Sequence, residues 1–239
     1  MLFRRTLTWV IIFSIAMGFL ESAVVVYIRE LLYPGGFDFP LVMMDGRLAV
    51  TEIAREAATI LMLLSVAWIA GRNFTERFGW FLLSFAVWDI FYYIFLYLLI
   101  GWPQGLLVWD VLFLIPVTWT GPVISPLLVC IYMISLAIVI LVNSYRGKRV
   151  VLTRVDWLML VTGAAIIIVA FSWDYSRFIL NEYSFTDLWN LPGRDGFFDY
   201  AAGYVPVSFN WVVFTAGSVL NYIGYSIIVK RVAGQAVAK

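Results

Sequence analysis

The stretch GLLVWDVLFLIPVTWTG, residues 105–121, decides how many times this chain crosses a membrane. It is apolar, but it is shorter than the roughly 20 residues with which a helix crosses about 30 Å of hydrocarbon. Pro116 lies inside the stretch and Pro122 follows it, and proline interrupts helical hydrogen bonding. The stretch therefore predicts a segment that enters the membrane without spanning it.

The composition of the whole chain places it in a bilayer. Its 239 residues are 63% hydrophobic and 13% charged, and the mean hydropathy is +0.93. Soluble domains are about 45–50% apolar and about 25% charged, so the composition excludes that class. A formal net charge of +1 also excludes a nucleic-acid binder, and a single cysteine excludes a disulfide scaffold.

Six other stretches are apolar enough to predict transmembrane helices, and the last of them is slightly more polar than the rest. They are 7–29, 51–70, 79–100, 122–142, 155–173 and 206–228. The first is longer than the apolar core of a signal peptide, and Glu21 stands where a cleavage motif would lie, so we expect it to be retained. The predicted fold is a single all-α domain, 1–239, forming a polytopic transmembrane helix bundle.

The distribution of basic residues indicates that 105–121 does not cross. If it does not, eleven basic residues share one side with both termini, against five on the other side. If it crosses, the split becomes six against ten. Cytoplasmic loops carry the excess of Lys and Arg, so the first arrangement is favoured, with both termini cytoplasmic. The eleven are Arg4, Arg5, Arg72, Arg77, Arg146, Lys148, Arg149, Arg154, Lys230, Arg231 and Lys239, and the five are Arg29, Arg47, Arg55, Arg177 and Arg194.

Two consequences follow for the outer side. A broken segment at membrane depth is tolerated where protein or a water-filled cavity covers its backbone, so 105–121 predicts a cavity that opens outward. Two long outer loops are expected, at 33–50 and 174–205. The first half of the second loop, with Leu188 among its apolar residues, predicts an interfacial amphipathic helix. Its second half is interpreted either as a lid over the cavity or as a connection along the surface.

Three carboxylates fall inside predicted spans: Glu21, Glu56 and Asp89. A charge at the centre of a membrane helix costs roughly 2.5–3.5 kcal/mol on insertion scales, so these side chains are expected to face the bundle interior. There they must be paired, hydrated, metal-bound or protonated. Intramembrane acids of this kind are typical of proton-donor or cation sites, and the three are the candidate catalytic residues.

Other polar and aromatic residues are candidates for binding a substrate. Arg55 is predicted to be the only basic residue at the depth of the acids, where it can pair with Glu52 at i+3 or with a carboxylate of a neighbouring helix. The sequence VWDI at 87–90 recurs as VWDV at 108–111, and Trp173-Asp174 is a third such pair. An indole can donate a hydrogen bond to the carboxyl beside it or stabilise a cation, although chance could also give this repeat. The candidate substrate-binding residues are Arg55, Glu52, Asp110, Trp88, Trp109, Tyr92 and Tyr93.

The absence of histidine limits the cofactors. Haem or chlorophyll ligated by histidine, the usual zinc sites, and Ser-His or Cys-His nucleophiles are all excluded. No cofactor and no metal site is predicted, while binding of Mg²⁺ by carboxylates stays open. Cys130 is expected to be a small buried hydrophobic residue.

Four stretches resemble a family of uncharacterised bacterial multi-pass integral membrane proteins. They are GFLESAVVVYIRELLYP (18–34), EIAREAAT (52–59), VWDIFYY (87–93) and VWDVLFLIPVTWTGPVISP (108–126). The resemblance covers about the first half of the chain. It implies a bacterial protein of the cytoplasmic membrane, and it transfers no activity and no catalytic residue.

Three functions are compatible with these features. The first is a membrane enzyme that uses its acids on a lipid or isoprenoid, with an outward-facing, carboxylate-lined pocket. The second is a proton- or cation-coupled transporter of a small molecule. The third is an accessory subunit whose acids pair with basic residues of a partner membrane subunit. The expected partners are therefore membrane lipids and possible partner subunits, with no nucleic acid.

Overall fold

The chain is an all-α polytopic bundle, as the sequence predicts. The computed structural model describes residues 2–42, 44, 46–115, 117–184 and 197–234. Six of its helices are long and apolar enough to cross a membrane. In chain order the elements are α1 (Leu2–Leu32), α2 (Gly46–Ala70), α3 (Phe74–Ile100), β1 (Trp109–Phe113), β2 (Trp119–Pro122), α4 (Ile124–Tyr145), α5 (Arg154–Glu182), α6 (Phe197–Ala202) and α7 (Trp211–Ala233).

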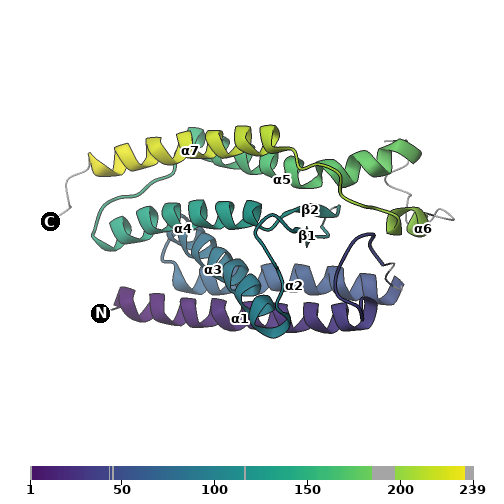
Figure 1. The fold of residues 1–239 in the computed structure, drawn as a ribbon. Helices are drawn as coiled ribbons and strands as arrows, with labels where there is room; N and C mark the ends of the chain where they lie inside the picture. Colours follow the sequence, from purple (N-terminus) through teal and green to yellow (C-terminus); the bar gives the residue numbers. More distant parts are fainter. Residues whose placement is uncertain (1, 43, 45, 116, 185–196, 235–239) are drawn as a thin grey trace.

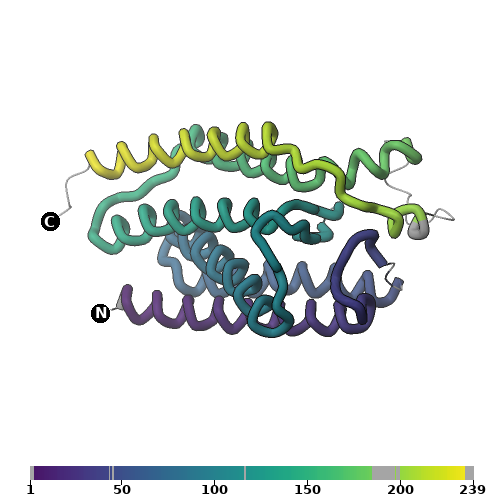
Figure 2. The backbone as a smooth tube through the Cα atoms, viewed as in Figure 1, coloured from purple at the N-terminus to yellow at the C-terminus, as the bar shows by residue number. Residues whose placement is uncertain are grey.

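The helices form two groups with a hairpin between them. Helix α3 packs against α1, α2 and α4, whereas α5 packs mainly on α7. Strands β1 and β2 continue the line of α4 and fill the layer between α5 and the pair α1 and α2 (Figure 1). The smooth backbone trace shows that α1 begins and α7 ends at the same end of the bundle (Figure 2). We refer to this as the terminal end, and to the other as the hairpin end.

Capping residues set several of the helix ends. The Asn73 side chain accepts the backbone N–H of Glu76 at 3.0 Å and begins α3, and Gly101, with a φ of 67°, ends it. Thr153 and Asp156 form a capping box at the start of α5. Both α3 and α5 therefore begin before the spans predicted for them, at the residue that follows the cap.

Residues 105–121 form a β-hairpin and do not cross the bundle. β1 and β2 are antiparallel, with Asp110 opposite Gly121, so the strands satisfy each other's backbone groups. The hairpin is closed at its base by a bond of 2.8 Å from the Ile124 N–H to the Leu106 carbonyl. The prediction of a broken segment and six spans is confirmed. Pro116 lies outside the described residues, as do Leu188, Arg194 and Lys239.

The described part of the second loop is helical, as expected, but it does not form a helix of its own. Residues 174–182 continue α5 without a break. The physical reason is local, since no Gly or Pro occurs between Trp173 and Glu182 to stop the helix. Residues 185–196 lie outside the described part of the chain, and the lid stays a prediction.

Small residues allow the close contact between α5 and α7. A Cβ atom on Gly217 would lie 2.8 Å from the carbonyl oxygen of Gly163, and a Cβ on Gly163 would lie 2.6 Å from the Asn221 side chain. Small residues at a helix interface let two backbones approach, so the pairing of α5 with α7 follows from these glycines.

Candidate functional site

A cavity of about 950 Å³ lies within the bundle, lined by α1, α3, α4, α5, α6, the hairpin, the segment after α1 and the part of α2 at the hairpin end. Its lining is mostly apolar and runs from Phe78 and Trp157, toward the terminal end, to Tyr33 and Ala201 at the hairpin end. Its size is near the upper end of the roughly 300–1,000 Å³ that is usual for small-molecule sites. All three predicted catalytic residues line it, and so does Asp110.

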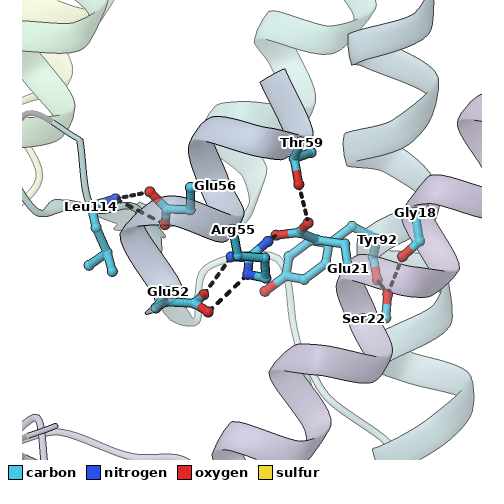
Figure 3. Close-up of polar contacts among 9 residues, drawn as sticks. All are labelled: Gly18, Glu21, Ser22, Glu52, Arg55, Glu56, Thr59, Tyr92 and Leu114. Carbon is cyan, nitrogen blue, oxygen red and sulfur yellow. Dashed lines mark hydrogen bonds and ion pairs between the residues drawn. The ribbon is translucent and has the colours of Figure 1, made fainter. Parts of the chain in front are cut away.

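Arg55 on α2 connects two of the acids, as Figure 3 shows. Its Nε donates to Glu52 at 2.9 Å, and its two terminal nitrogens form ion pairs with Glu52 and with Glu21 of α1. Thr59 also donates to Glu21, at 3.2 Å. Arg55 therefore pairs with both kinds of partner that the sequence predicts for it, Glu52 on its own helix and a carboxylate on a neighbouring helix. Glu21, a predicted catalytic acid, is committed to an ion pair that joins α1 to α2.

Glu56 points away from this cluster toward the hairpin (Figure 3). Its carboxylate accepts the backbone N–H of Leu114 at 3.0 and 3.2 Å, directly after β1 ends. No Lys or Arg among the described residues forms an ion pair with it. Glu56 is 5% exposed, so its carboxyl is buried against the cavity with a backbone donor as its partner.

Asp89 on α3, like Glu56, accepts its hydrogen bond from a neutral donor. The thiol of Cys130, on α4, donates to its Oδ2 at 3.1 Å, and the described residues offer it no basic partner. Cys130 is buried as expected, yet it is also a hydrogen-bond donor, which the sequence interpretation did not include. The single thiol of the chain thus lies against the central intramembrane acid.

Asp110 on β1 has a basic partner that the sequence analysis missed. Arg29 Nη2 lies 3.0 Å from Asp110 Oδ1, and the Tyr93 hydroxyl donates to Asp110 Oδ2 at 3.2 Å. The expectation that Arg55 is the only basic residue at this depth is therefore wrong. Arg29 follows Glu21 by eight residues and so lies near the same face of α1, a spacing that could have identified it.

The Trp-Asp repeat has no common structural role. Asp89 binds Cys130, Asp110 binds Arg29, and Asp174 accepts the Tyr204 hydroxyl at 2.9 Å. In the described part of the chain, none of the hydrogen bonds to these three carboxyls comes from the indole that precedes it.

Three of the four predicted aromatic residues instead line the cavity. Trp88 packs in a buried cluster with Met17 and Leu63, and its indole lines the cavity. Trp109 lies outside the cavity lining, with its ring 6.2 Å from that of Phe209. Tyr92 and Tyr93 both line the cavity, and their rings meet edge to face at 4.9 Å.

Neither metal binding nor comparison with known proteins assigns a role to the residues of the cavity. Among the residues that the structure describes, no three Cys, Asp or Glu side chains lie close enough to hold a metal ion. Comparisons of the chain with protein-family models, with curated proteins and with solved structures found no match.

Proposed function

We propose that this protein is a membrane enzyme that binds a lipid or isoprenoid in the cavity and acts on it by acid catalysis. The observation that supports this function best is the combination of a long apolar cavity with two carboxyls, Glu56 and Asp89, that line it without a basic partner among the described residues. An apolar chain can lie along α3 and α5 while its reactive group meets a carboxyl.

The chemistry requires a proton donor in an apolar setting. Burial without a counter-charge favours the neutral carboxylic acid, and such an acid can protonate an alkene or an ether oxygen. The proton passes to the substrate, a carboxylate remains, and positive charge develops on the substrate carbon. The faces of Trp88, Phe85 and Tyr92 in the cavity wall are suited to stabilise that charge.

The proposal divides the predicted catalytic acids into two roles. Glu56 and Asp89 are the proton donors. Glu21, because it pairs with Arg55 and Thr59, is a positioning residue that holds α1 against α2 at the mouth of the cavity. Glu52 and Arg55 belong to the same positioning cluster.

The protein's location is part of the proposal. The terminal end of the bundle carries most of the basic residues, so we place it on the cytoplasmic side of a bacterial cytoplasmic membrane. The hairpin, Glu56 and the Arg55 cluster then lie toward the outer face, and the substrate comes from the lipids of that membrane.

Lipid analysis of a deletion strain tests the function. The strain is rescued with the wild type, with Glu56→Gln, with Asp89→Asn, or with the control Glu30→Gln, whose carboxyl is exposed on α1 and does not line the cavity. Both test substitutions keep an oxygen that can accept the N–H of Leu114 or the thiol of Cys130. We expect normal abundance with a rate of lipid conversion reduced about 10²–10⁴-fold, the usual contribution of a general acid.

Other outcomes point to the alternatives. If deletion leaves the lipids unchanged but alters uptake of a small cation or acid, the protein is a transporter and the proposal is wrong. If Asp89→Asn instead removes a co-purifying membrane protein or lowers abundance, the acids serve a subunit interface.

A further inference from the structure

Arg29 has a hydrogen-bond donor that nothing in the described structure uses. Its Nη2 pairs with Asp110, while its Nη1 is buried and has no partner. The side chain is 8% exposed, and the residue lines the cavity. Buried polar groups in native structures are almost always hydrogen-bonded, so an unused nitrogen on a buried cation indicates an acceptor that is not among the described residues, and a bound ligand is one source of it.

The orientation of this donor is fixed by its neighbours. The guanidinium carbon lies 3.8 Å from the centre of the Trp102 ring and 4.3 Å from that of the Phe37 ring. The two ring centres lie 5.9 Å apart, so the rings flank the guanidinium on adjacent sides and leave its other sides for hydrogen bonds. Asp110 accepts from Nη2, and Nη1 is the nitrogen without a partner.

Two further residues of the cavity lining have donors without a partner. The indole nitrogens of Trp88 and Trp119 are buried without partners, and both residues are in its wall. Among the described residues, the buried side-chain nitrogens and oxygens without a partner are all nitrogens that donate. The wall therefore has an excess of donors, which a ligand with acceptor oxygens would satisfy.

The charges exclude an anionic head group. Arg29 and Arg55 are the basic residues of the described lining, and each is already paired, with Asp110 and with Glu21 and Glu52. A phosphate would therefore meet no free cation, and the cluster of Arg55 with its two carboxylates already carries an excess of negative charge. A head group with a neutral oxygen avoids this repulsion.

We propose that the lipid held in this cavity has an uncharged, oxygen-bearing head, a hydroxyl or carbonyl, whose oxygen accepts a hydrogen bond from Arg29 Nη1. This inference rests on the proposed function and specifies its substrate class. Arg29 is then the residue that distinguishes an oxygenated head from a bare hydrocarbon end, whereas Glu56 and Asp89 act on the substrate.

Binding of three isoprenoid probes to the purified full-length protein tests the inference. Geranylgeraniol has a neutral oxygen, geranylgeranyl phosphate has the same chain with an anionic head, and phytane is an isoprenoid hydrocarbon without oxygen. Native mass spectrometry in detergent micelles gives the relative affinities. We expect the alcohol to bind at least about tenfold more tightly than either of the others, since a hydrogen bond to a charged donor contributes about that factor or more.

Arg29→Lys is the sharpest variant, because lysine keeps the charge that faces Asp110 but has a single nitrogen to donate from. We expect it to weaken binding of the alcohol about tenfold and to leave phytane binding unchanged. Arg47→Lys, at an exposed position of α2, is the matched control and should change neither.

The other outcomes distinguish a failure of the inference about the head group from a failure of the proposed function. If Arg29→Lys weakens alcohol and hydrocarbon alike, the effect is structural and the inference is wrong. If the phosphate binds most tightly, the head group is anionic and the inference is also wrong, while the cavity remains a lipid site. If none of the three probes binds, the proposed function fails together with the inference.

Discussion

Arg29, in the last turn of α1, forms a buried ion pair with Asp110 on β1, with 3.0 Å between Nη2 and Oδ1. The two residues are 81 positions apart in the sequence, and both side chains are at least nine-tenths buried. The pair attaches the hairpin to the first helix, and through Tyr93 it also reaches α3. The hairpin, which lines the cavity, is therefore held by a charge interaction as well as by packing.

Removing one partner of this pair should destabilise the protein strongly. Asp110→Leu leaves the Arg29 charge buried without a counter-ion, and breaking a buried pair costs about 3–5 kcal/mol. The double variant Arg29→Met/Asp110→Leu removes both charges and should recover most of that loss. Thermal unfolding in detergent measures the difference. Equal melting temperatures for the single and double variants would show that the pair does not hold the hairpin.

The ion pairs of Arg55 with Glu21 and Glu52 connect α1 to α2, and we expect them to contribute to stability as well. Arg55→Met leaves Glu21 and Glu52 unpaired at 8% and 7% exposure, so it should cost about 3–5 kcal/mol. Adding Glu21→Gln and Glu52→Gln should restore stability because the repelling charges are gone. The same unfolding measurement applies, with the exposed Arg47→Met as control. A single variant as stable as the wild type would contradict the role of Arg55 as the link between the helices.

Close packing of α5 on α7 predicts that Gly217 tolerates no larger side chain. Its Cβ would lie 2.8 Å from a backbone oxygen of α5, so Gly217→Ile must separate the helices, with a cost of about 1–3 kcal/mol for overpacking. Gly105→Ala is the control, because nothing lies within 4 Å of a Cβ there. Similar melting temperatures for the two variants would mean that the helices do not depend on this contact.

Hydrogen bonds of Tyr204 connect the segment after α6 to the rest of the bundle. It is fully buried, its hydroxyl lies 2.8 Å from that of Thr120 on β2, and it donates to Asp174. Burial raises the pKa of Tyr204 above its ordinary value, so the hydroxyl keeps the proton that Asp174 accepts. Tyr204→Phe removes these bonds and should cost about 1–3 kcal/mol.

Limited proteolysis measures the local effect of Tyr204→Phe. Cleavage between α6 and α7 should become faster, while the turn between α2 and α3 is cleaved at an unchanged rate and is the internal control. Unchanged cleavage after α6 would show that the Tyr204 hydroxyl does not fix this segment.

The six-span arrangement predicts which sites are accessible from each side. Gln104→Cys, before the hairpin, should react with a membrane-impermeant thiol reagent in intact cells. Arg149→Cys, between α4 and α5, should react only after the cells are permeabilised. The native Cys130 is buried and should stay unlabelled in both. Labelling of both sites from the same side would require 105–121 to cross the membrane.

The sequence predicted much of the candidate site because intramembrane charges are costly. Glu21, Glu56 and Asp89 were identified on that ground, and all three line the cavity. The pairing of Arg55 with Glu52 follows from their i+3 spacing. Arg29 was missed because it lies at the end of the predicted first span, where a basic residue looks like an ordinary anchor at the membrane surface.

What the sequence by itself determined is the class of the protein and the number of its spans. Apolar length and the distribution of basic residues are properties of local stretches, and they predicted six helices and a broken segment at 105–121. The partners of each acid depended on tertiary structure. Glu56 binds a backbone N–H that exists only because the hairpin turns beside α2, and Asp110 meets Arg29 only because β1 packs on α1. Contacts between distant residues depend on how the helices and the hairpin pack together, and the spacing of residues along the sequence does not determine that packing.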